Sequence, residues 1–328
     1  MNAEPAYAVA FTARERAELV PAEEPSAPPG PREVAGRTLA SVISTGTELA
    51  VYQLAESFPA RTGYAAVFEV GEVGAEITDV KPADRLLCLG PHQSRQRVTR
   101  DEAVLVPEGL APEVAAFARM MTVSMSTLTT TTARPPEKVL VTGLGLVGNL
   151  AAQVFAACGY EVIASEPDAR RRDLARRVGI GAVFPTVPVD DPSIAGQVGL
   201  ALECSGHEQA VLDACRVVRK RGEVVLVATP WRRRSDIYAH EVLRAAFHNY
   251  VVLRSGWEWE LPRHRTDFQV NSIFGNFAGA LRWLAEGRVR VDGLYALRPP
   301  REAPQAYQDL LHARAEGLTF VFDWGDCP

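Results

Sequence analysis

Apolar and polar residues alternate differently in the two parts of this chain. Before residue 119 the apolar residues form short runs, broken by glycine and proline, over 38–45, 65–74, 84–90, 96–100 and 102–107. Short runs separated by turn residues are typical of strands. The first part is therefore predicted to be a β-rich domain closed on itself.

The pattern changes near residue 137, where strand-like and helix-like segments begin to alternate. Strands are predicted over 138–142, 161–165, 200–206, 223–229 and 250–256, and helices over 148–159, 168–179 and 208–220. This alternation predicts an α/β unit with a parallel, doubly wound sheet. After residue 267 two helices, 277–287 and 303–317, precede a last strand at 318–324.

A glycine-rich loop follows the first strand of the α/β unit. Gly143, Gly145 and Gly148 stand in G-x-G-x-x-G spacing, and a helix opens at Leu146 and Val147. The first glycine permits a tight turn, the second lets a pyrophosphate approach the backbone, and the third lets the helix pack closely on the strand. Because a helix N-terminus offers amide donors to phosphates, these residues predict a dinucleotide site.

The residue that ends the second strand of this unit bears on the choice of dinucleotide. Glu166 stands where a carboxylate accepts the ribose hydroxyls and repels a 2′-phosphate, which favours NAD. Arg170, Arg171 and Arg172 follow, and they either form a solvated helix face or neutralise the phosphate of NADP. NAD is therefore predicted, and NADP is not excluded.

Composition narrows the classes of protein. The chain has 328 residues, of which 47% are hydrophobic and 23% charged, which suits two globular domains. A net charge of -5 favours neither a nucleic-acid partner nor a membrane surface. We find no secretory signal and no stretch that could span a bilayer, so a cytoplasmic location is expected.

The cysteines predict neither disulfides nor a structural zinc. All five are scattered without a C-x-x-C pair. Cys88 and His92 have a spacing that two ligands of one metal can use, but two ligands do not make a site.

Six segments, in this order along the chain, resemble the medium-chain dehydrogenase/reductase superfamily. They are 42–49, 61–74, 80–87, 139–148, 203–206 and 221–229. The likeness is strongest to the zinc-type alcohol and polyol dehydrogenases, including those of pigment and natural-product pathways. It implies a GroES-like catalytic domain over 1–118 and 267–328, a Rossmann domain over 119–266, and a homodimer formed through the late Rossmann strands.

The positions that hold zinc in that branch are changed in this chain. The resemblance places ligands at Thr45, at Tyr64 with Ala65, and near 118–121, where no thiolate, imidazole or carboxylate occurs. Since a catalytic zinc needs three protein ligands, no zinc is predicted. A side chain must then handle the proton that accompanies hydride transfer.

Three residues are the candidates for that proton transfer. Tyr64 stands at a former ligand position, where it either donates to a substrate oxygen or fills the volume of the metal. Thr47 matches the proton-relaying hydroxyl of the zinc enzymes and is otherwise a turn residue. His92 carries an imidazole, a type of side chain that commonly accepts and donates protons in enzymes, and is otherwise structural. Glu48 is assigned to the substrate site, where it contacts substrate, orients these groups, or makes only a turn hydrogen bond.

Other residues are assigned to the cofactor and the substrate through the resemblance. The cofactor set comprises Thr122, Arg171, Cys204, Ser205 and Thr229 besides the glycine loop and Glu166. Trp231, Trp257 and Trp259 are assigned to the substrate, and the last two fill a subunit interface in the alternative interpretation.

The leading hypothesis is a zinc-independent oxidoreductase that interconverts a secondary alcohol and a ketone with NAD(H). Its small-molecule substrate is expected to be a polyol, a cyclitol or a natural-product intermediate. One alternative is an NADPH-dependent enone or quinone reductase of the same superfamily. Another is a catalytically silent nucleotide-binding protein, which the loss of the metal ligands would also explain.

Overall fold

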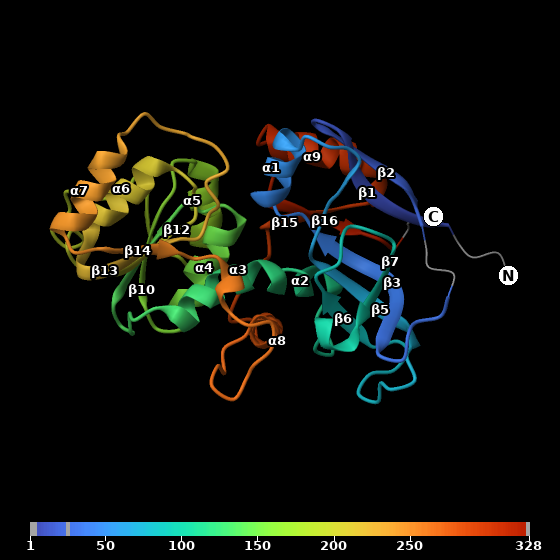
Figure 1. The fold of residues 1–328 in the computed structure, drawn as a ribbon. Helices are drawn as coiled ribbons and strands as arrows, with labels where there is room; N and C mark the ends of the chain where they lie inside the picture. The colour runs from blue at the N-terminus through green and yellow to red at the C-terminus, as the bar shows by residue number, and fades with distance from the viewer. Residues whose placement is uncertain (1–4, 24–26, 326–328) are drawn as a thin grey trace. The chain divides into compact units, whose positions relative to one another are not determined.

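The computed structural model describes residues 5–23 and 27–325 of the chain, which divide into two compact units (Figure 1). The first unit comprises residues up to Arg119 together with Phe277–Glu286 and Gly293 onward. The second comprises Met120–Asn276 and Gly287–Asp292. Residues 267–276 belong to the second unit, whereas the sequence-based boundaries assigned them to the first domain.

The first unit is built on two β-sheets. The smaller sheet has the order β2-β1-β4, and the larger has the order β15-β16-β3-β5-β6-β8 with β7 paired to β3. The strands are β1 (Ala6–Ala13), β2 (Arg16–Ala22), β3 (Glu33–Val42), β4 (Ala60–Arg61), β5 (Ala66–Val73), β6 (Arg85–Cys88), β7 (Arg95–Thr99), β8 (Ala103–Leu105), β15 (Tyr295–Arg298) and β16 (Thr319–Asp323). The C-terminal strand β16 pairs with β3, which returns the end of the chain to its first domain.

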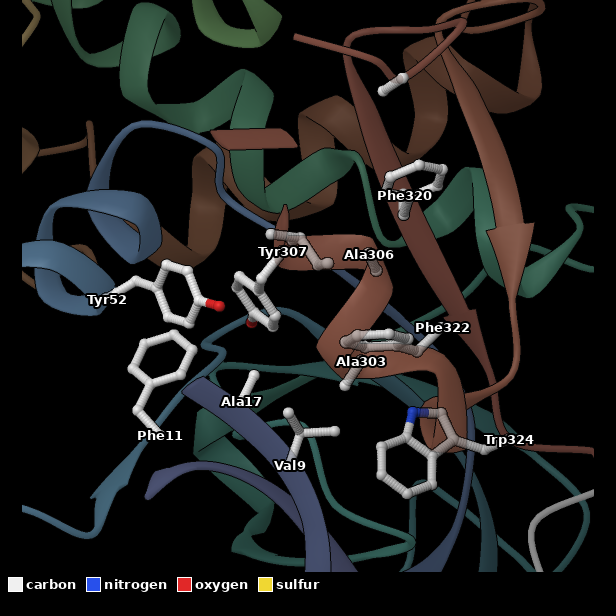
Figure 2. Close-up of a cluster of buried hydrophobic side chains, with 12 residues drawn as sticks. Val9, Phe11, Ala17, Tyr52, Ala303, Ala306, Tyr307, Phe320, Phe322 and Trp324 are labelled. Atoms are coloured by element: carbon white, nitrogen blue, oxygen red, sulfur yellow. The ribbon is translucent and has the colours of Figure 1, made fainter. Parts of the chain in front are cut away.

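Helices and aromatic residues close one side of this unit. Its helices are α1 (Thr47–Leu54), α2 (Pro112–Ala115), α9 (Ala303–Leu311), the short turns Arg100–Glu102 and Pro300–Glu302, and parts of α3 (Ala118–Thr130) and α8 (Ile273–Ala285). Figure 2 shows the aromatic cluster between α1, α9 and the sheets. Phe11 lies 4.9 Å from Tyr307 and 5.0 Å from Tyr52, measured between ring centroids. These rings fix α1 and α9 relative to the sheet.

The second unit is a six-stranded parallel sheet of order β11-β10-β9-β12-β13-β14. Its strands are β9 (Lys138–Thr142), β10 (Glu161–Ser165), β11 (Ala182–Phe184), β12 (Val198–Glu203), β13 (Val218–Leu226) and β14 (Val252–Ser255). Its helices are α4 (Leu146–Ala157), α5 (Ala169–Arg177), α6 (Glu208–Val217), α7 (Ala239–His248) and the remaining parts of α3 and α8, with a short turn at Glu258–Glu260. This order, with β9 central, confirms the doubly wound Rossmann architecture.

Local sequence explains where several of these elements begin and end. Every residue of the central strand β12 is buried, which is why 198–203 reads as an almost continuous apolar run. Asp168 caps α5, because its carboxylate accepts from the backbone amides of Arg170 and Arg171. The predicted helix over 208–220 is wrong in its last turn, since α6 ends at Val217 and Val218 pairs with Val198 as the start of β13.

In the described part of the chain, no helix is long and apolar enough to cross a membrane.

Candidate active site

The glycine loop of the second unit has the backbone geometry that a dinucleotide loop requires. Gly143 follows β9 with φ of +81°, a conformation that residues with a side chain rarely adopt. A Cβ on Gly148 would lie 1.8 Å from the carbonyl oxygen of Gly143, so only glycine lets α4 approach this closely. Around Gly145 nothing lies within 4 Å of a built Cβ, which leaves the loop open where α4 begins. These observations fit a pyrophosphate bound at the N-terminus of α4.

Glu166 stands beside this loop, directly after β10, with its carboxylate buried. One carboxylate oxygen accepts from the amide of Leu144 at 2.8 Å and the other from the amide of Asp168 at 3.0 Å. The guanidinium of Arg171 lies 3.7 Å from Glu166, while that of Arg172 donates to the carbonyl oxygens of Glu166 and Pro167. Arg171 is therefore the member of the arginine run that faces this carboxylate.

The remaining residues assigned to the cofactor follow other strand ends of the same sheet. Ser205 lies against Gly143, since a Cβ built on that glycine would come within 2.9 Å of the Ser205 amide nitrogen. Glu203 accepts from the Ser205 amide at 2.7 Å and so holds this turn. Burial and the charge of Glu203 raise the pKa of the Cys204 thiol well above its usual value, which leaves it protonated. Thr229 follows β13, and its carbonyl oxygen lies near Gly206.

Thr122 and the tryptophans complete the second unit's predicted residues. Thr122 is buried, and its hydroxyl donates to the carboxylate of Glu258 at 3.3 Å. Trp257 is 68% exposed, and Trp231 and Trp259 are also exposed in the single chain. The structure therefore fixes Thr122 inside the unit and leaves the three indole rings on its surface.

In the first unit, Tyr64 lies between two hydroxyls and a cation. Its phenol donates to the hydroxyl of Ser44, and the hydroxyl of Thr47 is also within hydrogen-bond reach. The guanidinium carbon of Arg119 lies 4.7 Å from the centroid of the Tyr64 ring. Burial raises the pKa of Tyr64, while Arg119 and the two hydroxyls oppose that rise. Tyr64 therefore holds its proton at neutral pH, in a setting that can also stabilise its anion.

The hydroxyl of Ser44 links Tyr64 to a set of buried polar groups around Glu48. We call this set the Glu48 network. Its members are Ser41, Ser44, Glu48, Thr62, His92 and Tyr307. Glu48 is 3% exposed. One carboxylate oxygen accepts from the hydroxyls of Thr62 and Tyr307, each at 2.5 Å. The other accepts from the backbone amide of Ser44 at 2.7 Å. Burial would raise the pKa of Glu48, but the charge and hydrogen bond of His92, with Thr62 and Tyr307, hold this pKa below its usual value.

His92 is fully buried within the Glu48 network. Its Nε2 lies 3.1 Å from Glu48, and its Nδ1 lies 2.7 Å from the hydroxyl of Ser41, which also accepts from the indole of Trp324. Its backbone amide donates to the carbonyl oxygen of Thr62. Gly63, with φ of +90°, makes room for it, because a Cβ there would come within 2.5 Å of the His92 amide. Both ring nitrogens of His92 are thus engaged inside the protein.

The structure places Tyr64, Thr47, Glu48 and His92 in one region of the first unit, but not in equivalent positions. Tyr64 and Thr47 are half-buried, whereas Glu48 and His92 lie in the interior. Assigning Glu48 to substrate contact is therefore corrected: its carboxylate is enclosed by donors of its own unit.

Sequence reasoning missed several members of this site. Ser44, Thr62 and Tyr307 are buried partners of Glu48, and Arg119 lies over Tyr64. For Arg119 a signal existed, since it is the lone charge in the apolar run 114–123. For Tyr307, far away in α9, local sequence offers no such signal (Figure 2).

The chain is similar to known dehydrogenases in sequence and in fold. A family model described as zinc-binding dehydrogenase matches residues 147–257. The L-threonine 3-dehydrogenase of Thermococcus kodakarensis is 28% identical over 300 residues, which cover 78% of this chain and 79% of that protein. The chain belongs to the medium-chain dehydrogenase/reductase superfamily.

Solved structures show the same fold along nearly the whole chain. The galactitol-1-phosphate dehydrogenase of Escherichia coli has a TM-score of 0.81 at 18% identity, over 97% of this chain and 99% of that one. An acetophenone reductase of Geotrichum candidum, solved in complex with NAD, has a TM-score of 0.79 at 16% identity, over 99% of each chain. This member of the superfamily is an NAD(P)-dependent oxidoreductase.

The residues of this dehydrogenase at the expected metal position do not fit zinc. Thr45, Tyr64 and Ala65 offer no thiolate, imidazole or carboxylate, and neither do residues 118–121. Within residues 5–23 and 27–325, no three His, Cys, Asp or Glu side chains gather as a metal site would require. Cys88 is buried, which raises the pKa of its thiol to about 12, and His92 already has two partners.

Proposed function

We propose that this dehydrogenase interconverts a secondary alcohol and a ketone without a metal, and that Tyr64 handles the proton. The observation that supports this most directly is the setting of the Tyr64 phenol, between the hydroxyls of Ser44 and Thr47 at a position where the resemblance expects a zinc ligand. A positioned phenol can donate to a carbonyl oxygen during reduction, and its anion can accept from an alcohol during oxidation.

In this proposal the residues around Tyr64 have distinct tasks. Thr47 and Ser44 hydrogen-bond the phenol and relay protons between it and water. Glu48 and His92 act as positioning residues, since the Glu48 carboxylate fixes the backbone of Ser44. The bound nicotinamide supplies or accepts the hydride.

NAD is the proposed cofactor. Gly143, Gly145 and Gly148 would hold the pyrophosphate at the N-terminus of α4, and Glu166 beside them would accept the ribose hydroxyls. The guanidinium of Arg171 faces Glu166, so Arg171 is the residue that could neutralise the 2′-phosphate if NADP were bound.

The proposed substrate is a polyol, a cyclitol or a related natural-product intermediate. The names of the relatives support this class, since the threonine and galactitol-1-phosphate dehydrogenases both act on hydroxylated metabolites. We further propose a cytoplasmic homodimer. The edge strand β14 has one paired side, and its Val252 and Leu253 are exposed, so a second copy could continue the sheet.

The test follows nicotinamide absorbance with secondary alcohols, polyols, enones and quinones in excess chelator. We expect alcohol oxidation and ketone reduction to survive the chelator, and Tyr64→Phe to lower kcat by about 10²–10⁴-fold, the usual size of a general acid–base effect. Since the pKa of Tyr64 is raised, ketone reduction should keep its rate at neutral pH and fall only above the ordinary tyrosine value of about 10.

Tyr52→Phe is the matched control, because it removes a phenol of the same unit whose hydroxyl donates to the Glu15 carbonyl oxygen instead. It should change kcat little. Loss of activity in chelator that zinc restores would overturn the metal-free mechanism. Turnover of enones alone, with a preference for NADPH, would favour the enone or quinone reductase. Cofactor binding without turnover of any substrate would favour a catalytically silent nucleotide-binding protein.

A further inference from the structure

Arg119 is a nearly buried cation that packs on the residue proposed to move the proton. It lies at the start of α3 and is 5% exposed. Its guanidinium carbon lies 4.7 Å from the ring centroid of Tyr64 and 6.0 Å from that of Phe277. Burying a guanidinium away from water costs free energy, and its attraction to an aromatic face compensates for part of this desolvation. The contact places a permanent positive charge against the π-face of Tyr64.

A cation in this position acts differently on the two forms of a phenol. When Tyr64 gives up its proton, the negative charge spreads from the oxygen into the ring. A guanidinium above the ring attracts the anion more strongly than the neutral phenol, and poor solvation strengthens that attraction. The hydroxyls of Ser44 and Thr47 stabilise the oxygen end of the same anion.

A second charged group, Glu48, acts on Tyr64 from a different element. Glu48, on α1, opposes ionisation of the phenol, and its carboxylate is paired with His92 and hydrogen-bonded by Tyr307. Burial raises the pKa of Tyr64 most strongly, and Arg119 is the main influence that lowers it. Arg119 therefore opposes the effects of burial and of the carboxylate on this pKa, but only in part, since the pKa stays raised.

We propose that Arg119 is a positioning residue that tunes proton transfer by Tyr64 through the face of its ring. This inference rests on the proposed function. In reduction, a hydride from the nicotinamide forms the new C–H bond, the O–H bond of Tyr64 breaks, and its proton forms the hydroxyl of the alcohol. The phenolate that remains lies under the Arg119 cation until water returns a proton to it. Oxidation follows the reverse order, with the phenolate as base.

The experiment measures the pKa of Tyr64 directly and without catalysis. The full-length protein is labelled with 3-fluorotyrosine, and the ¹⁹F resonance of Tyr64 is identified by its absence in Tyr64→Phe. Its titration is then compared in the wild type, Arg119→Met and Arg119→Lys. An opposite charge within a few ångströms typically shifts a pKa by about 1–3 units, so Arg119→Met should raise the Tyr64 pKa by about one unit or more.

Arg119→Lys retains the charge and should keep the pKa closer to that of the wild type. The limb of the pH–rate profile that reports Tyr64 should move by the same amount as the resonance. Arg298→Met is the matched control, because Arg298 lies 5.1 Å from the ring centroid of Phe320 in the same unit and pairs with Glu302 and Asp309. It should leave the titration unchanged.

An unchanged Tyr64 pKa in a folded Arg119→Met protein, checked by circular dichroism, would overturn the inference. If that variant does not fold, Arg119→Gln gives the second neutral test with the same expectation. A shifted pKa in Arg119→Met, together with full activity of Tyr64→Phe, would instead overturn the proposed function, while the coupling between the two side chains would stand.

Discussion

The cofactor half and the catalytic half of this dehydrogenase assemble their sites from the chain in different ways. In the Rossmann unit, Gly143, Gly145 and Gly148 occupy one loop and the first turn of one helix. In the GroES-like unit, the Glu48 network draws residues from β3, α1, α9 and the loops that contain Thr62 and His92. The first site depends on backbone shape, and the second depends on side chains that meet only after folding.

This difference bears on which substitutions each site tolerates. The glycine loop loses its shape when a side chain is added, because the backbone atoms around it have little room to move. A buried polar site fails when a partner is lost, because the groups left behind are no longer paired. The two halves should therefore respond to opposite kinds of change, addition of atoms in one and removal of a charge in the other.

The largest effect is expected at the third glycine. In Gly148→Val the new Cβ would overlap the carbonyl oxygen of Gly143, 1.8 Å away. Overlap with backbone cannot be relieved by a rotamer, so the free energy of unfolding should fall by more than about 4 kcal/mol, a loss seen only for exceptional substitutions. Denaturant unfolding and calorimetric titration with NAD would measure the loss of stability and of binding.

Gly145→Ala is the matched control, since nothing lies within 4 Å of its Cβ. It should leave stability within about 1 kcal/mol of the wild type and lower NAD affinity by about tenfold or more, because the methyl group would stand where the pyrophosphate approaches. An unchanged NAD affinity in this variant would mean that the loop does not hold the pyrophosphate.

The second-largest effect is expected when the buried carboxylate of Glu48 loses its charge. In Glu48→Gln the amide nitrogen would face the donors of Thr62 or Tyr307, and His92 would lose its anion. Leaving buried hydrogen-bonding groups unpaired costs about 1–3 kcal/mol, and more where a charged group is involved, so we expect a loss of about 3 kcal/mol at pH 7. Urea unfolding at several pH values would measure it.

The pH dependence of that loss follows from the lowered pKa of Glu48. An ionised Glu48 stabilises the native state above its unfolded pKa of about 4.3, and this stabilisation disappears as the pH falls through the lower native pKa. The difference between wild type and Glu48→Gln should therefore shrink in acid. Thr62→Val, which removes one donor and keeps the carboxylate, should cost only about 1–2 kcal/mol and retain the acid dependence. A difference that is constant from neutral to acid pH would show that Glu48 is not ionised in the native state.

The same contrast explains what the sequence could predict. The strands and helices of the Rossmann unit follow from local patterns, such as the buried run of β12 and the Asp168 cap of α5. The end of α6 does not follow from the local pattern, because Val218 pairs with Val198 as a strand although the helical spacing continues past it. His92 is enclosed because Gly63 makes room for it, and that relation appears only in three dimensions. The resemblance makes Tyr64 a candidate, but its contacts with Ser44 and Arg119 appear only in the folded structure.

The smallest expected effect concerns the choice between NAD and NADP. Arg171 is half-exposed and lies 3.7 Å from the buried Glu166, so solvent reaches only the guanidinium side of this ion pair, and we expect the pair to contribute at most about 1 kcal/mol. Arg171→Gln should therefore lower NADP affinity less than about fivefold and leave NAD affinity unchanged, since 1.4 kcal/mol corresponds to tenfold. Arg176→Gln is the matched control, because Arg176 lies on the same helix with similar exposure but pairs with Asp173. Titrations with both dinucleotides would measure the ratio. A wild type that prefers NADP, and that loses this preference in Arg171→Gln, would contradict the proposal of NAD. In that case the arginine, and not Glu166, would decide which cofactor the Rossmann unit accepts.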